Sequence, residues 1–103
     1  MFLPFNHEYP LQLHKGEYLN ILADVNIPGY IELHIKKCDQ SSPAFGYTFD
    51  YSDFLSNKYM YRGEIDQLST TIVIKANRIG TLYINFETPL EESSLLTAKL
   101  IYS

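Results

Sequence analysis

Residues 70–87, TTIVIKANRIGTLYINFE, contain two runs in which every second side chain is apolar. Because successive side chains of a β-strand point to opposite faces, this period of two predicts two strands that each bury one face. NRIG at 77–80 is a short connection between the two runs. The side chains expected to face inward are Ile72, Ile74 and Ala76 in the first run and Leu82, Ile84 and Phe86 in the second.

The same alternation continues through most of the chain and predicts about eight strands, spaced by roughly eight to twelve residues. Between them, NIPG at 26–29 is a predicted turn, and CDQSSP at 38–43 and TPLEESS at 88–94 are predicted loops. No stretch of convincing length has a helical period, so the pattern predicts an all-β, antiparallel sandwich or barrel. The predicted strands cover residues 9–13, 17–25, 30–37, 45–51, 58–65, 70–76, 81–87 and 95–103.

Length, composition and charge limit the class of protein. A chain of 103 residues fits a single domain, 1–103, whose core needs no metal or disulfide. Apolar residues make up 46% and charged residues 19%, which argues against intrinsic disorder. The formal net charge of −4 suits neither nucleic acid nor an anionic membrane surface, and no apolar run approaches the length of a membrane span.

The sequence does not decide between two settings for the protein. Cys38 is the only cysteine, so no internal disulfide can form, and there is no N-x-[ST] sequon. Residues 1–10, MFLPFNHEYP, lack the basic region and the sustained apolar stretch of a signal peptide. These features fit either a cytosolic protein or a piece of a longer chain to which Met1 was added.

The segment 43–63, PAFGYTFDYSDFLSNKYMYRG, draws attention as a binding surface because it holds seven aromatic rings. From Phe45 to Tyr51 the rings fall on every second residue and share one face of a strand, and Tyr59 and Tyr61 repeat the pattern. These rings form either a packed ladder with hydroxyls at its rim or an exposed platform for a sugar or a protein. The candidate ligand- or partner-binding residues are Tyr47, Asp50, Tyr51, Asp53, Tyr59 and Tyr61.

No motif in the chain points to catalysis or to a cofactor. Phosphate-binding, dinucleotide-binding and nucleophile-elbow motifs are absent from the sequence. Asp50 and Asp53 have no glycine between them, which suits a solvated face better than a calcium loop. The histidines lack the spacing of metal ligands. We therefore expect no catalytic residue, no metal site and no cofactor.

Four segments together carry a resemblance to a known family. They are LQLHKGEYLNILADV, GYIELHIKK, YTFDYSD, and TTIVIKANRIGTLYINFE followed by LLTAKLIYS. Gly80 with Tyr83, and the Asp50–Tyr51 pair, carry the likeness most specifically. Over about residues 9–102 the chain is similar to the bacterial pre-peptidase C-terminal domain. The resemblance implies a jelly-roll-like β-sandwich that serves as a non-catalytic accessory module, often extracellular. NIPG replaces an acidic turn of the family, so no calcium role is carried over.

The leading functional hypothesis is a non-catalytic β-sandwich module with a structural or protein-binding role in a larger extracellular or surface-associated assembly. Its partner would be another protein or another copy of the chain, met through edge strands or through the rim of tyrosines. Lys36 with Lys37, Arg62 and the prolines are expected to protect exposed strand edges.

Two alternatives stay open from the sequence alone. In a carbohydrate-binding module, Tyr47, Tyr51, Tyr59 and Tyr61 would stack on sugar faces, and at least two of these rings would be exposed and coplanar. In a small cytosolic protein, the chain would act as an inhibitor or an adaptor.

Overall fold

The computed structural model describes residues 2–16, 18–38, 44–87 and 94–102, which form eight β-strands. This described part of the chain contains no helix that could cross a membrane. The strands agree with the predicted ones to within a few residues, whereas most of the two predicted loops, 39–43 and 88–93, lies outside the described residues. In chain order the strands are β1 (Glu8–Leu13), β2 (Tyr18–Val25), β3 (Gly29–Lys37), β4 (Phe45–Asp53), β5 (Lys58–Ile65), β6 (Ser69–Ala76), β7 (Gly80–Glu87) and β8 (Ser94–Tyr102).

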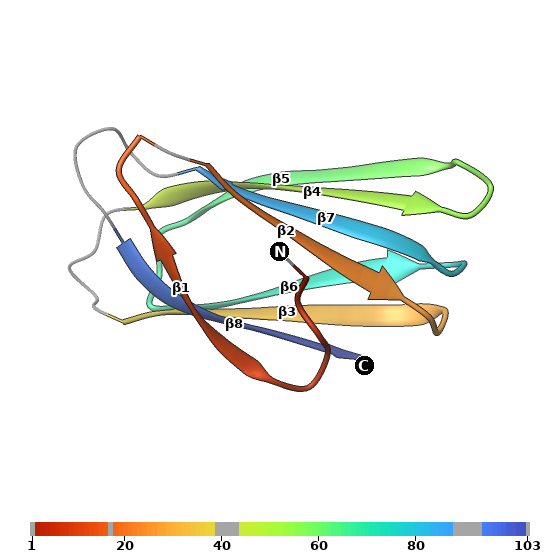
Figure 1. Ribbon diagram of the computed structural model, residues 1–103, viewed down its shortest axis with the longest axis horizontal. Coiled ribbons are helices and arrows are strands. Elements are labelled where there is room, and N and C mark those ends of the chain that lie inside the picture. The colour runs from red at the N-terminus through yellow and green to blue at the C-terminus, as the bar shows by residue number, and fades with distance from the viewer. Residues whose placement is uncertain (1, 17, 39–43, 88–93, 103) are drawn as a thin grey trace.

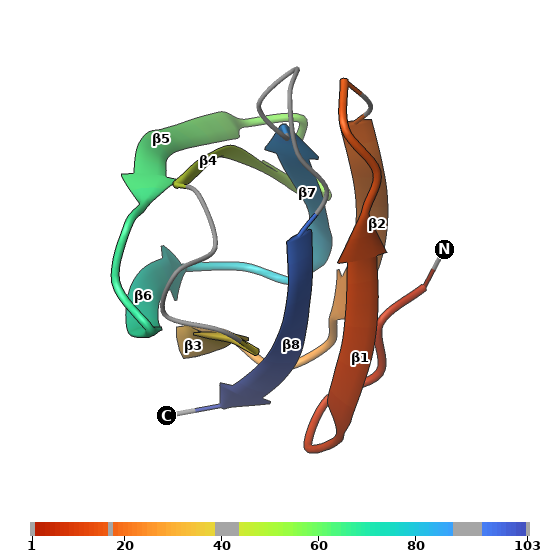
Figure 2. The same ribbon diagram turned by 90° about the vertical axis from the view of Figure 1, so that its left-hand side faces the viewer.

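Two four-stranded sheets pack face to face, one with the order β1-β8-β3-β6 and the other with β2-β7-β4-β5 (Figure 1; Figure 2). All neighbouring strands are antiparallel. The first half of the chain pairs with the second half in reverse order: β1 with β8, β2 with β7, β3 with β6 and β4 with β5. This is one long hairpin rolled into two sheets. The predicted all-β, jelly-roll-like sandwich is therefore confirmed.

The core lies between the sheets and consists of alternate side chains from all eight strands. Leu33 of β3 pairs in register with Ile72 on one side and with Leu100 on the other. Leu33, Ile74 and Leu100 are each 0% exposed, so the predicted inward faces are confirmed. Each such side chain contributes about 1.5–3 kcal/mol through burial, which makes this alternation the main determinant of the fold.

The edges of the sheets are β1, β6, β2 and β5. The prediction that Lys36 and Lys37 protect an edge is wrong, because β3 lies inside its sheet between β8 and β6. Lys37 is instead buried, and its Nζ lies 5.8 Å from the ring centroid of Phe45. Pro10 and Arg62 do lie on edge strands, β1 and β5.

One end of the sandwich gathers the β2–β3, β4–β5 and β6–β7 turns, which lie at the right-hand side of Figure 1. The N-terminal segment reaches the same region along the free edge of β2. Phe2 forms a parallel bridge with Leu22, and the backbone amide of Leu3 donates to the carbonyl of Leu22 at 2.8 Å. The N-terminal segment thus lies along β2 and, with the β2–β3 turn, lines one hollow.

Candidate functional site

The six predicted site residues lie on the neighbouring strands β4 and β5, but not on one surface. Asp50 points outward from the sandwich, in the opposite phase to the rings of β4. Tyr51 pairs in register with Tyr59, on the inward side. The residues that share this inward phase are Tyr47, Tyr51 and Asp53 on β4 and Tyr59 and Tyr61 on β5.

Tyr51 is fully buried, at 0% exposure, and its hydroxyl donates a hydrogen bond to the backbone carbonyl of Arg78. Burial raises the pKa of the Tyr51 phenol, and the nearby carboxylate of Asp53 raises it further. The side chain therefore stays neutral and bonded to the β6–β7 turn. This arrangement leaves it no access to an external ligand.

Asp53 accepts hydrogen bonds from its own turn. The backbone amides of Leu55 and Asn57 donate to one carboxylate oxygen at 2.9 Å each, and the side-chain amide of Asn57 donates to the other at 3.0 Å. A guanidinium nitrogen of Arg78 lies 3.7 Å from that second oxygen. Burial alone would raise the pKa of this carboxyl, but the hydrogen bonds and Arg78 outweigh it and hold the pKa below its ordinary value.

Gly80 allows the β4–β5 turn and the β6–β7 turn to pack closely against each other. A Cβ at Gly80 would lie 2.7 Å from the Cα of Asp53, so only glycine allows β7 to pass so close to the end of β4. The backbone amide of Phe54 donates to the carbonyl of Ile79 at 3.1 Å and joins the same turns. Two of the four residues that carry the family resemblance most specifically, Tyr51 and Gly80, thus hold the β4–β5 turn against the β6–β7 turn.

The ring of Tyr47 lies across Gly63 on the neighbouring strand, where a Cβ would come within 2.6 Å of the ring. Tyr47 also stacks on Phe49, with the ring centroids 4.8 Å apart. Tyr47 and Tyr61 are half-buried against the core, and of the four tyrosines Tyr59 alone, at 37%, is exposed. These rings therefore do not provide the two exposed, coplanar surfaces that the sugar-binding hypothesis requires.

The most distinctive exposed surface is formed by the turns themselves. Turns are normally polar, yet large apolar side chains occupy these turns and the adjoining N-terminal segment, with exposures of 45% to 63%. We call this surface the apolar loop end. Its members are Phe2, Ile27, Phe54, Leu55 and Ile79.

Two hollows are lined by four of the five members of the apolar loop end. Phe2 and Ile27 line one hollow, and Phe54 and Ile79 line the other. Both hollows share Asp24 and Asn26, at the end of β2 and in the turn that follows. The two hollows therefore adjoin each other through these two polar residues, and Leu55 follows Phe54 in the same turn.

The apolar loop end continues onto the outward face of the β2-β7-β4-β5 sheet through Tyr83, which is 47% exposed and lines the second hollow. Tyr83 pairs in register with Asp50, the one predicted site residue that points outward. Sequence reasoning missed Tyr83 as a surface residue. The signal was present, because Tyr83 falls between the inward-facing Leu82 and Ile84.

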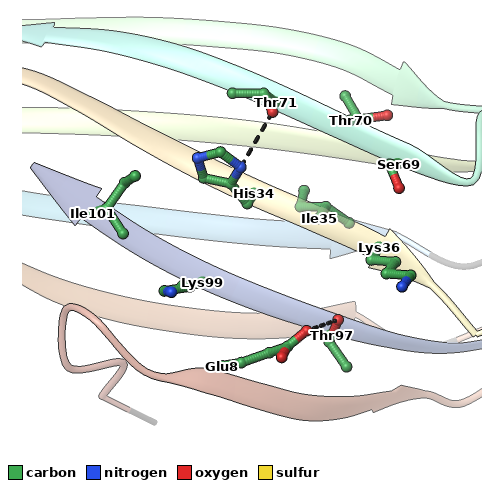
Figure 3. Close-up of a pocket in the computed structure, with 10 residues that line it drawn as sticks. All are labelled: Glu8, His34, Ile35, Lys36, Ser69, Thr70, Thr71, Thr97, Lys99 and Ile101. Carbon is green, nitrogen blue, oxygen red and sulfur yellow. Dashed lines mark hydrogen bonds between the residues drawn. The ribbon is translucent and has the colours of Figure 1, made fainter. Parts of the chain in front are cut away.

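A separate hollow lies on the outward face of the β1-β8-β3-β6 sheet (Figure 3). The hydroxyl of Thr71 lies 3.3 Å from Nδ1 of His34, and Nε2 of His34 lies 3.3 Å from a carboxylate oxygen of Glu32. Hydroxyl, imidazole and carboxylate thus follow one another, but β3 pairs with strands on both sides and has no free backbone N–H groups for an oxyanion. The hollow offers polar groups for binding and no assembled catalytic site.

Among the described residues, no three His, Cys, Asp or Glu side chains gather closely enough to hold a metal ion. The pair Asp50 and Asp53, which the sequence places close together, is divided between the outward and inward faces of β4. Asp53 already accepts three hydrogen bonds. The two carboxylates therefore cannot converge on one ion.

The fold defines the class of protein as a small β-sandwich domain with jelly-roll topology. No family model and no curated protein matches the chain. Among solved structures, the chain is similar to the pre-peptidase C-terminal domain of a collagenase from Bacillus anthracis, with a TM-score of 0.65, 9% sequence identity, and coverage of 96% of this chain and 91% of the other. It is also similar to the Yersinia pseudotuberculosis-derived mitogen, with a TM-score of 0.67, 8% identity, and coverage of 94% and 85%. The first likeness confirms the fold expected from the family resemblance.

Proposed function

We propose that the chain is a non-catalytic module that binds another protein through the apolar loop end. The observation that carries the proposal is the exposure of five large apolar side chains from the N-terminal segment and three turns, four of which line two adjoining hollows. Their combined apolar area is on the order of 400 Å², comparable with the largest patch on a typical monomer, which is often functional. Contact with a partner would remove this area from water.

The charge around the apolar loop end favours a protein partner over a membrane. Asp24 is exposed beside both hollows, and the chain has a formal net charge of −4. An interfacial membrane site normally surrounds its apolar residues with lysine and arginine, whereas here Arg78, next to Ile79, lies 3.7 Å from the carboxylate of Asp53. A protein surface with an apolar centre and basic groups at its rim fits these features.

The setting that we propose is a larger extracellular or cell-surface assembly, in which the sandwich is an accessory unit. The collagenase structure with this fold is itself one domain of a larger enzyme, which supports an accessory role. The tight hydrogen bonding between the turns also supports binding, because the apolar side chains stand on backbone that is already held in place.

The test compares the wild-type chain with the double variant Phe54→Ser/Ile79→Ser. A partner captured by the immobilised wild-type chain is purified, and its Kd is measured against each protein alone. Loss of two central apolar contacts should weaken binding by at least about 25-fold. The matched control is Val73→Ser, because Val73 is 54% exposed on the other sheet.

Binding that is equally strong in the double variant would refute the apolar loop end as the contact surface. Vesicles of phosphatidylcholine and phosphatidylserine provide a second arm of the test. If the vesicles bind the wild-type chain and not the double variant, the apolar loop end binds a membrane surface and not a protein.

A further inference from the structure

Two of the four edge strands, β1 and β2, carry a device against further pairing, whereas β5 and β6 have neither a proline nor a covering segment among the described residues. On β1, Pro10 lacks the N–H that a neighbouring strand would need. On β2, the N-terminal segment covers part of the edge through the bridge between Phe2 and Leu22. Strand β5 has neither device: it spans eight residues, contains no proline and carries no charged side chain in its inward phase. Its backbone is therefore open to a further strand.

The outward face of β5 carries charged side chains that form no ion pair with the other described residues. Lys58 lies near one end of the strand and Glu64 near the other, with Arg62 between them. Six residues of extended strand separate Lys58 from Glu64 by about 20 Å, so the two side chains cannot pair with each other. No ion pair of either residue occurs within the described part of the chain.

We propose that β5 pairs with β5 of a second copy of the chain, antiparallel and about a two-fold axis that passes through Tyr61. This register places Lys58 of each copy opposite Glu64 of the other and forms two complementary charge pairs. Met60 of each copy lies opposite Arg62 of the other, so no two like charges face each other. The two sheets become one continuous eight-stranded sheet, because each contributes four strands.

The charge pattern selects this register over its neighbours. A two-fold axis at Met60 would place Lys58 opposite Arg62, and an axis at Arg62 would place Arg62 opposite itself. Like charges directly opposite each other on a sheet are destabilising. The complementarity therefore specifies a second copy of the same chain, since an isologous contact requires one strand to be complementary to itself.

The inward side of β5 is also suited to this pairing. Tyr59 of one copy would lie opposite Gly63 of the other, where the ring of Tyr47 already covers the glycine. The partly exposed ring of Tyr59 would thus gain an aromatic neighbour. Because the two β5 strands run in opposite directions, the two apolar loop ends lie at opposite ends of the dimer. The dimer would then present two binding surfaces facing apart.

Charge reversal tests this proposal on the full chain. Sedimentation equilibrium is measured from about 1 µM to about 1 mM, the range in which weak interfaces dissociate. Lys58→Glu and Glu64→Lys each place two like-charge pairs in the interface, so each should raise the dimer Kd at least about tenfold. The double variant Lys58→Glu/Glu64→Lys restores both complementary pairs, and its Kd should return to within about threefold of the wild type.

The matched control is Lys75→Glu, which makes the same charge change on β6, one of the two edge strands of the other sheet. It should leave the dimer Kd unchanged, and near-UV circular dichroism should report the same fold for every variant. A wild-type chain that stays monomeric up to about 1 mM overturns the proposal. So does a double variant that does not recover, or dissociation caused by Lys75→Glu and not by Lys58→Glu. Loss of the interface with unchanged binding to a partner would leave the apolar loop end intact as a separate site.

Discussion

Gly80 stands where β7 passes the end of β4, and a methyl group at this position would collide with the backbone. A Cβ would lie 2.7 Å from the Cα of Asp53 and also press on the carbonyl of Ser52. Asp53 cannot move aside easily, because the amides of Leu55 and Asn57 hold its carboxylate at 2.9 Å. We therefore expect Gly80→Ala to lower the free energy of unfolding by about 2–3 kcal/mol, in the range observed for overpacked sites.

Two other strand glycines provide matched comparisons. At Gly63 a Cβ would meet the ring of Tyr47, a side chain that can rotate away, so Gly63→Ala should cost about 1–2 kcal/mol. At Gly46 the nearest atom would be the Cβ of Glu87 at 3.9 Å, which is an ordinary contact. Gly46→Ala should change stability by less than about 1 kcal/mol, and in the favourable direction, because alanine restricts the unfolded chain.

Urea unfolding followed by far-UV circular dichroism measures all three variants, with the m-value checked for constancy. The expected loss of stability increases from Gly46→Ala through Gly63→Ala to Gly80→Ala. If Gly80→Ala is tolerated as well as Gly46→Ala, the close packing of the two turns is wrong.

Three further predictions follow from the buried residues. Tyr51→Phe removes the hydrogen bond to the carbonyl of Arg78 and should lower the free energy of unfolding by about 1–2 kcal/mol in the same urea assay. Leu33→Ala, at the centre of the core, should lower it by about 3–4 kcal/mol, and a loss below about 1 kcal/mol would contradict its burial. Because the pKa of Asp53 is lower in the folded state than its ordinary value of 3.8, its charge stabilises the fold above that pH and ceases to do so as the pH falls through the folded pKa. Wild-type stability should therefore approach that of Asp53→Asn on acidification, and a difference that is independent of pH would refute this role.

The sequence predicts the strands and their inward faces well, because both depend on a local alternation of apolar side chains. Ile74 and Leu82, for example, are assigned to the core by their immediate neighbours alone. The alternation does not tell which strands are neighbours, so the position of Lys36 and Lys37 on an inner strand rather than an edge strand was not predictable. Strand order depends on pairing between residues far apart in the chain.

The candidate site could be predicted only in part for the same reason. The rings of the segment 43–63 stand out in the sequence, but the phase of β4 and β5 places most of them in or against the core, whereas Phe54 and Tyr59 are exposed. The sequence predicts Asp53 as a solvated carboxylate. Its hydrogen-bond donors cannot be predicted locally, because they depend on the conformation of the turn that contains Asn57. The apolar loop end is formed by turns that are distant in the sequence. A single apolar residue in one turn, such as Ile27, therefore does not predict a shared surface.

Hydrogen exchange on the complex with a purified partner tests most directly whether the apolar loop end is the binding surface. We predict slower exchange at amides of the β2–β3, β4–β5 and β6–β7 turns, around Ile27, Phe54 and Ile79, with little change on the β1-β8-β3-β6 face. Protection confined to that face, and absent from the three turns, would contradict the account.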